Sequence, residues 1–398
     1  MQSGKQKPKN INNKKAESLN KSLCPYRKKC GGCQLSNMSY ERQLSFKQVK
    51  AIKLLGKYCH VDEIIGMQNP YHYRNKVQAA FDERKGEIIS GVYQSSTKSV
   101  VAVDSCMIED ILADEIIVTI RKLLKSFKLR PFNSDTNKGF LRHVLVKRSF
   151  STNQIMVVLV TAAKEFKSAL KFVNALISRH PEITTVVQNI NADYNGLMLG
   201  NESIILHGDG YIEDILCGFK FRISPKAFYQ INPLQTEVLY NKALEFAKLS
   251  GNESLLDAYC GTGTIGIIAA KRVKNVVGVE LNTDAVKDAV INAELNGVKN
   301  LEFFNDDAGK FMVKAAEKER NFDVVIMDPP RAGASLQFLK SLVTLSPQKI
   351  VYISCNPETL ARDLSFLTRK GYKAQKIQPV DMFPHTEHVE TIVYLEKI

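Results

Sequence analysis

The stretch that decides the fold spans residues 254–281 and reads SLLDAYCGTGTIGIIAAKRVKNVVGVEL. It contains an apolar strand-like run, a glycine-rich turn, an apolar helix and a second strand-like run, in that order. Three more short apolar runs, NLEFFNDD, FDVVIMDPP and KIVYISCNP, follow it, and each ends in polar residues. Helical segments separate these runs. This alternation predicts a parallel, doubly wound α/β sheet whose site lies at the carboxyl ends of the strands.

The glycine-rich turn is compatible with two kinds of ligand. Gly261, Gly263 and Gly266 fit G-x-G-x-x-G between a strand and a helix, and Glu280 ends the next strand, which alone fits a dinucleotide site. Asp257 argues against that reading, because its carboxylate would repel phosphate oxygens. Its position favours S-adenosylmethionine, which has no phosphate and carries a positive amino acid portion, with Glu280 holding the ribose hydroxyls. The simpler alternative is that Asp257 only caps the turn.

The other strand ends carry acidic groups that agree with this ligand. Asp306 and Asp307 follow the run NLEFF, where they are placed to reach an adenine amine. Asp328 opens DPPRAG, a loop that its prolines stiffen. The segment AFYQINP, which precedes the sheet, offers Phe228 and Gln230 to close over the ligand.

Cys355 follows the last of these apolar runs, at the point where a helix is expected to begin. A single cysteine is usually a buried apolar side chain. Here a helix N-terminus would stabilise the thiolate, and the position beside a methyl donor favours a nucleophile. A thiolate that adds to C6 of uracil makes C5 reactive toward a methyl group, and a base must then remove the C5 proton. The tail DMFPHTEHVE offers Glu387 and Glu390 as that base, with His385 and His388 nearby.

Five motifs together resemble the RNA uracil-5-methyltransferases, which make 5-methyluridine in tRNA and rRNA. These motifs are SCNP, DPPRAG, DAYCGTGTIG, AFYQINP and DMFPHTEHVE, and the resemblance covers about residues 20–398. It implies that Cys355 is the nucleophile and that Glu390, not Glu387, is the base. It also implies cofactor contacts through Gln230, Tyr259, Glu280, Asp307 and Asp328. Tyr259 thereby becomes a better candidate for a contact than Asp257.

A separate group of cysteines lies near the N-terminus. Cys24, Cys30 and Cys33 supply three thiolates in a short loop, and Cys59 or Cys106 would be the fourth. The residues alone allow either zinc or an iron–sulfur cubane, since both take four thiolates. The rRNA-modifying branch of the family is similar in this pattern, which implies a [4Fe–4S] cluster on Cys24, Cys30, Cys33 and Cys106. Methyl transfer needs no electron, so we expect the cluster to shape the RNA-binding surface.

The net charge of +14, with a pI near 9.2, favours a polyanionic partner such as RNA. We expect a disordered basic arm (1–22), an iron–sulfur loop (23–40), a central α+β RNA-binding domain (41–220) and a Rossmann-like methyltransferase domain (221–398). Many cluster-bearing members of the family carry a β-barrel RNA-binding domain before the cysteines, whereas only the arm precedes them here. We therefore expect RNA contacts from the arm, the cysteine loop and strands such as FLRHVLVKRS.

Two local patterns in the central region give further predictions. FLRHVLVKRS and QIMVVLVTA alternate as two antiparallel strands would. Residues 39–58 have helical spacing, with apolar positions at Leu44, Val49, Ile52, Leu54 and Leu55.

The reaction predicted from the sequence is methyl transfer from S-adenosylmethionine to C5 of a uridine in 23S rRNA. The alternatives are the same reaction on the T-loop uridine of tRNA, and an RNA-binding or folding factor in which methylation is secondary. No apolar run approaches the roughly 20 residues that span a bilayer, and the basic N-terminus lacks the apolar core of a secretory signal. We therefore expect a cytoplasmic monomer that does not bind membranes.

Overall fold

The computed structural model describes residues 24–95, 97, 99–192 and 197–398. The predicted basic arm, residues 1–22, lies outside these ranges. The described residues form ten helices and sixteen strands, which are arranged in two seven-stranded sheets and one two-stranded ribbon.

The C-terminal sheet confirms the predicted parallel core. Its strand order is β12-β11-β10-β13-β14-β16-β15, and the first five strands in that order are parallel. The last two form a hairpin, in which β16 runs antiparallel to β14 and β15 runs antiparallel to β16. The strands are β10 (Ser254–Ala258), β11 (Asn275–Glu280), β12 (Leu301–Asn305), β13 (Val324–Met327), β14 (Lys349–Ser354), β15 (Tyr372–Val380) and β16 (Glu390–Lys397).

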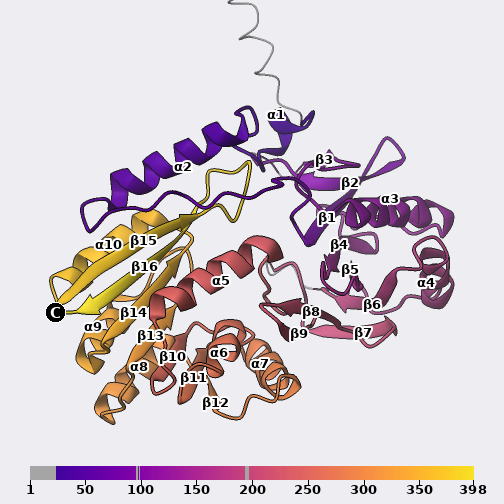
Figure 1. The fold of residues 1–398 in the computed structure, drawn as a ribbon. Helices are drawn as coiled ribbons and strands as arrows, with labels where there is room; N and C mark the ends of the chain where they lie inside the picture. Colours follow the sequence, from indigo (N-terminus) through magenta and orange to yellow (C-terminus); the bar gives the residue numbers. More distant parts are fainter. Residues whose placement is uncertain (1–23, 96, 98, 193–196) are drawn as a thin grey trace, which may run out of the picture.

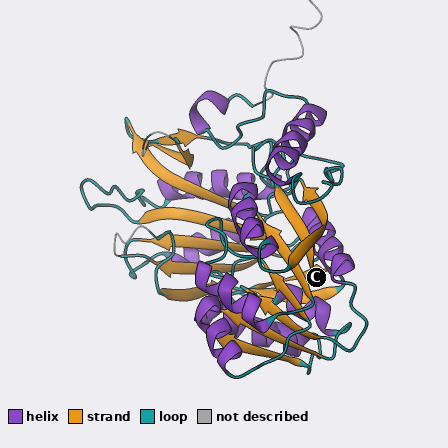
Figure 2. Cartoon of the chain, turned by 90° about the vertical axis from the view of Figure 1, so that its left-hand side faces the viewer, coloured by secondary structure: helices purple, strands orange, loops and turns teal. Residues whose placement is uncertain are grey.

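Helices cover both faces of this sheet, as the doubly wound pattern requires (Figures 1 and 2). One face packs on α5 (Pro233–Ala247), α6 (Thr264–Ala270) and α7 (Thr283–Leu295). The other packs on α8 (Ala308–Glu317), α9 (Leu336–Leu345) and α10 (Pro357–Thr368). Leu255 belongs to the first core and its neighbour Leu256 to the second. Burial on both faces explains why these strands are continuous apolar runs.

The central sheet has the order β3-β2-β1-β4-β5-β6-β7, and α3 and α4 pack on one of its faces. The predicted antiparallel pair is confirmed as β4 and β5. Helix α4 connects β5 to β6, which therefore pair in parallel. The elements are β1 (Lys76–Arg84), β2 (Glu87–Tyr93), β3 (Val100–Ala102), α3 (Ile111–Ser126), β4 (Leu141–Arg148), β5 (Ile155–Thr161), α4 (Ala169–Ile177), β6 (Ile183–Ile190) and β7 (Glu202–His207).

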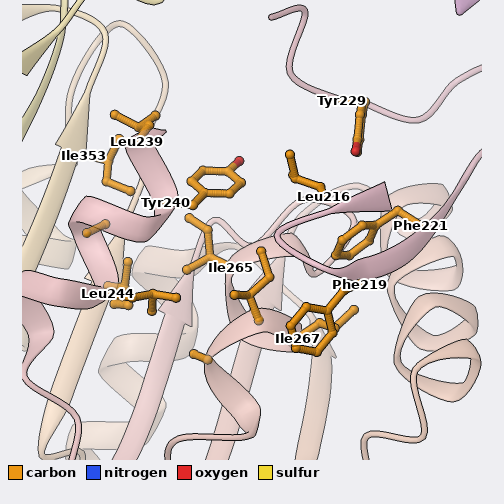
Figure 3. Close-up of a cluster of buried hydrophobic side chains, with 14 of the residues drawn as sticks. Leu216, Phe219, Phe221, Tyr229, Leu239, Tyr240, Leu244, Ile265, Ile267 and Ile353 are labelled. Atoms are coloured by element: carbon orange, nitrogen blue, oxygen red, sulfur yellow. The ribbon is translucent and has the colours of Figure 1, made fainter. Parts of the chain in front are cut away.

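The ribbon of β8 (Ile212–Leu216) and β9 (Phe219–Ile223) joins the C-terminal core. Figure 3 shows Phe219 of β9 beside Ile267 of α6, and it shows Tyr240 and Leu244 of α5 in the same cluster. This cluster fixes α5, and with it the AFYQINP segment that precedes α5, against the methyltransferase sheet.

Two helices precede the central sheet, α1 (Arg27–Cys30) and α2 (Tyr40–Leu55). Although α2 comes early in the chain, it packs beside α10 and β15 of the C-terminal sheet (Figure 1). The helix predicted within residues 39–58 is confirmed, although two of its apolar residues, Val49 and Ile52, are exposed. The buried side chains of α2 are Gln43, Lys47, Ala51 and Leu55. Its buried stripe is therefore half polar. The domain division at residue 220 stays a prediction.

Candidate active site

The turn after β10 places Tyr259 at the carboxyl edge of the sheet. Tyr259 has φ 65°, and Gly261 and Gly263 have φ 56° and 77°. A Cβ at position 263 would lie 2.8 Å from Phe303, so a glycine is required there. A left-handed tyrosine is unusual and persists only where packing holds it; its ring centroid lies 5.3 Å from that of Phe338.

Asp257 is buried beneath this turn rather than displayed on it. Its Oδ2 accepts a 2.7 Å hydrogen bond from the N–H of Gly266 in α6. Burial raises the pKa of Asp257 to about 7, and the charges of Asp328 and Glu280 raise it further against that hydrogen bond. The contact matches the simpler alternative, in which Asp257 caps the turn.

Glu280 and Asp307 lie at the ends of neighbouring strands. Glu280 Oε2 accepts a 3.1 Å hydrogen bond from the N–H of Gly261, and Oε1 accepts one of 2.7 Å from Asn282. Asp307 caps α8 by accepting from the N–H of Lys310 at 3.0 Å. Both carboxylates are thus held in fixed positions at the edge where the parallel strands end.

Cys355 and Glu390 are brought together by the pairing of β14 with β16. Ser354 of β14 lies opposite Thr391 of β16, and the strands are antiparallel, so Cys355 and Glu390 are the next residues along. Asp328 follows β13, the other neighbour of β14. Three candidates from distant motifs therefore meet at one point of the sheet.

We expected a helix N-terminus to stabilise the Cys355 thiolate, but the net effect of the surroundings is a raised pKa of the thiol. Burial raises that pKa to about 11, with the charges of Glu390 and Asp328 adding to it and Arg331 opposing it. The side chain of Asn356 already caps α10 by accepting from Glu358 N–H at 3.1 Å. The thiol therefore keeps its proton while the neighbouring carboxylates are charged.

Glu390 is the buried carboxylate of the tail, with 5% of its surface exposed, whereas Glu387 is exposed. Burial raises the pKa of Glu390 well above its usual value, Asp328 adds to this, and Arg331 opposes it. Within the described part of the chain, its Oε2 has no hydrogen-bond partner. A buried oxygen without a partner is unfavourable for folding.

The DPPRAG loop is held against the start of α10. Asp363 Oδ2 accepts from the N–H of Ala334 at 2.9 Å and from the hydroxyl of Tyr352 at 2.7 Å. The carbonyl of Arg331 accepts from Asn356 Nδ2 at 3.1 Å. These bonds fix Asp328 and Arg331 beside Cys355.

Two site residues escaped the sequence analysis. Arg331 lies within DPPRAG, so the motif itself could have pointed to it. Tyr240 comes from α5 and carries no motif. It is buried, its side chain bonds to Gln230, and burial followed by the charge of Asp328 raises its pKa. Tyr240 thereby links Gln230 to the acidic group around Asp328.

The candidate metal-binding cysteines pack in two different parts of the structure, because Cys59 lies apart from Cys33 and Cys106. Burial raises the pKa of Cys33 to about 12, and its neighbours Cys30 and Cys24 raise it further. Cys33 and Cys106 contact the same small apolar cluster around Tyr73, whereas Cys59 packs against the C-terminal core. Across residues 24–95, 97, 99–192 and 197–398, no three His, Cys, Asp or Glu side chains form a group that could hold a metal ion. The ligand set Cys24, Cys30, Cys33 and Cys106 stays a prediction.

A parallel sheet with acidic strand ends around a glycine-rich turn is typical of S-adenosylmethionine-dependent methyltransferases. The profile of the tRNA (Uracil-5-)-methyltransferase family matches residues 39–398, so the chain belongs to that family. It is an S-adenosylmethionine-dependent RNA (uracil-5-)-methyltransferase.

The chain is similar to several known proteins. It is 43% identical to an uncharacterized RNA methyltransferase of Clostridium tetani, over 94% of this chain and 82% of that protein. It is 42% identical to one of Clostridium acetobutylicum, over 96% and 85%. A crystal structure of Pyrococcus abyssi tRNA (uracil-54, C5)-methyltransferase with S-adenosyl-L-homocysteine matches with a TM-score of 0.77 and 30% identity, covering 92% of this chain and 85% of that one. In the described residues, none of the helices has the length and apolar character to cross a membrane.

Proposed function

We propose that this enzyme methylates C5 of a uridine in 23S rRNA, with Cys355 as nucleophile and Glu390 as base. The observation that carries the proposal is the pairing of β14 with β16, which sets the two residues side by side. An electrostatic effect supports their proximity, because the charge of Glu390 raises the pKa of the Cys355 thiol.

The covalent sequence uses these two side chains. The Cys355 thiol first gives its proton to solvent water, and the thiolate forms a bond to C6 of the uracil as the C5–C6 double bond becomes an enolate. C5 then takes the methyl group, the carbon–sulfur bond of the donor breaks, and S-adenosylhomocysteine leaves. Glu390 removes the C5 proton, the C5–C6 double bond re-forms, and the Cys355–C6 bond breaks. The raised pKa of Glu390 suits this step, because it makes the carboxylate a stronger base.

The cofactor supplies the methyl group, and side chains of the protein orient the cofactor. We assign its contacts to Gln230, Tyr259, Glu280, Asp307 and Asp328. The fixed positions of Glu280 and Asp307 at neighbouring strand ends support this assignment. The Tyr259 ring, held in a left-handed turn, would form an apolar wall of the same site.

We further propose a [4Fe–4S] cluster on Cys24, Cys30, Cys33 and Cys106. Cys24 and Cys30 both raise the pKa of Cys33, and Cys33 and Cys106 contact the same apolar cluster, which fits four thiolates around an iron–sulfur cluster. Such a cluster would supply structure to this region rather than an electron. Iron and a visible absorption band in protein purified without oxygen would support it, whereas zinc in their place would overturn it.

The target RNA has two candidates. The cysteine pattern favours 23S rRNA, while similarity to the Pyrococcus abyssi enzyme, whose name specifies uracil 54 of tRNA, favours the T-loop. Mapping 5-methyluridine in rRNA and tRNA from cells with and without the gene separates them. Loss from 23S rRNA alone is the expected result, and loss from tRNA alone would replace the rRNA proposal. For either RNA, we expect the protein to act as a cytoplasmic monomer.

Substitutions at the two reacting residues test the mechanism. Cys355→Ala is expected to abolish methyl transfer while RNA binding persists. Glu390→Gln is expected to trap a protein–RNA adduct, seen as a slow band on a denaturing gel. Methyl transfer by the Cys355→Ala protein would refute the covalent route. Unchanged cellular function with that variant would favour an RNA-binding or folding factor instead.

A further inference from the structure

The segment that leads into Glu390 is held by residues from the other end of the chain. We call residues 381–387 the strap; it connects β15 to β16 and reaches α2 (Figure 1). Within this strap, the carbonyl of Met382 accepts from Asn232 Nδ2 at 2.9 Å, and that of Pro384 accepts from the hydroxyl of Tyr73 at 3.0 Å. A surface loop between two strands rarely has so many long-range partners.

Gln43 of α2 holds the middle of the strap. Its Oε1 accepts from the N–H of His385 at 2.8 Å, and its Nε2 lies 3.2 Å from Nδ1 of the same residue. His385 has φ 69° and is buried. A left-handed residue needs neighbours that fix it, and the Gln43 amide supplies two of those contacts.

Lys47 holds the start of the strap. Its Nζ lies 2.6 Å from Asp381 Oδ1 and donates to the carbonyl of Phe383 at 3.0 Å. The side chains of Lys47 and Asp381 are both fully buried, and the hydroxyl of Tyr40 bonds to Asp381 Oδ2 at 2.9 Å. Residues 40, 43 and 47 lie on one stripe of α2, since residues three and four apart share a helix face.

We propose that Gln43 and Lys47 are positioning residues for proton removal by Glu390. They act by holding the strap, and neither is expected to touch the substrate. The idea rests on the proposed function, because it takes Glu390 as the base. It explains why two of the four buried side chains of α2 are polar. Gln43 and Lys47 form hydrogen bonds with the strap instead of filling an apolar core.

The same contacts connect the cysteine loop to the strap. The N–H of Leu35, two residues after Cys33, donates to the carbonyl of His385 at 2.9 Å. Tyr73 contacts Cys33 and also bonds to Pro384. The strap therefore lies between the N-terminal cysteines and the base.

A single-turnover experiment with Gln43→Leu tests the proposal. Unmodified transcripts of 23S rRNA and, in a parallel arm, of tRNA are mixed with enzyme and S-adenosylmethionine, and the adduct is followed on denaturing gels. We expect the adduct to form normally and to resolve about 10- to 100-fold more slowly, because a small displacement of a catalytic group has effects of this size. Binding of S-adenosylhomocysteine should be unchanged.

Gln48→Leu is the matched control on the same helix. Gln48 makes two hydrogen bonds, to Asp62 and Ile64 rather than to the strap. Gln43, in contrast, makes two to the strap and one to the carbonyl of Met38. A general weakening of α2 would slow both variants equally, and that outcome would overturn the proposal, as would normal adduct resolution in Gln43→Leu. Glu390→Gln is run beside them: if it traps no adduct, the proposed function fails and the inference falls with it.

If Gln43→Leu does not fold, a second variant tests the same proposal. Lys47→Met combined with Asp381→Leu removes the buried pair without leaving a charge behind, a change that is often neutral for stability. Slow adduct resolution in the folded double variant supports the proposal, and wild-type resolution contradicts it.

Discussion

The glycine-rich turn and the strap both hold acidic groups at the same sheet edge, but they are built from contacts of very different range. In the turn, Asp257 bonds to Gly266 nine positions away, and Glu280 bonds to Gly261 nineteen positions away. In the strap, Lys47 and Asp381 are 334 positions apart. The turn is a local structure, whereas the strap exists only when both ends of the chain have folded.

We infer from this difference that the turn serves cofactor binding and that the strap serves proton removal. The turn lies where we place the cofactor, and its bonds are to backbone N–H groups of its own loop. The strap leads into Glu390, and its bonds come from α2 and the cysteine loop. Substitutions in the turn should weaken cofactor binding, whereas substitutions that release the strap should lower global stability and slow proton removal.

The largest expected effect comes from breaking the buried pair of the strap. Lys47→Met leaves the Asp381 carboxylate buried, with the Tyr40 hydroxyl as its remaining hydrogen-bond donor among the described residues. Removing one partner of a buried ion pair costs about 3–5 kcal/mol. We expect the free energy of unfolding in urea to fall by that amount.

The double variant Lys47→Met with Asp381→Leu serves as the control, and it should recover most of the loss. If the single and double variants were equally unstable, packing of the lysine stem, and not the unpaired charge, would explain the effect.

The sequence predicted the turn well because its signals are local. Strand, glycine turn and helix follow one another within one segment, and the acidic residue at each strand end marks the site edge. The same reasoning placed Cys355 correctly after β14. The choice of Glu390 over Glu387 came from the resemblance, whereas the antiparallel register of β14 and β16 that sets it beside Cys355 was not predicted.

The strap could not be predicted from the sequence. Gln43 and Lys47 look like solvent-facing residues of an amphipathic helix, whereas the apolar Val49 and Ile52 are the exposed ones. Nothing local marks a lysine whose ionic partner lies more than three hundred residues away. The raised pKa of Cys355 could not be predicted for a similar reason, because the charges of Glu390 and Asp328 come from other strands.

A smaller effect is expected in the turn from Asp257→Asn. The folded-state pKa of Asp257 is raised to about 7 from an unfolded value near 3.9, so ionisation destabilises the fold. The penalty is absent below about pH 4, grows as pH rises, and is complete above about pH 7. Asparagine keeps an acceptor for Gly266 N–H. We expect the variant to be more stable than wild type at pH 8 and equal to it at pH 4. Denaturation at both pH values checks this, and a difference that does not change with pH would contradict the raised pKa.

The smallest expected effect tests whether the turn binds the cofactor. Tyr259→Leu removes the ring that packs on Phe338, and loss of an aromatic contact is worth about 1 kcal/mol, or roughly a fivefold weaker affinity for S-adenosylhomocysteine. Tyr259→Phe keeps the ring and should bind within about twofold of wild type. Calorimetric titration measures both. Adduct resolution should be normal in each variant, since the strap is untouched. If Tyr259→Leu slowed adduct resolution as Gln43→Leu is expected to, the turn and the strap would not divide binding from chemistry.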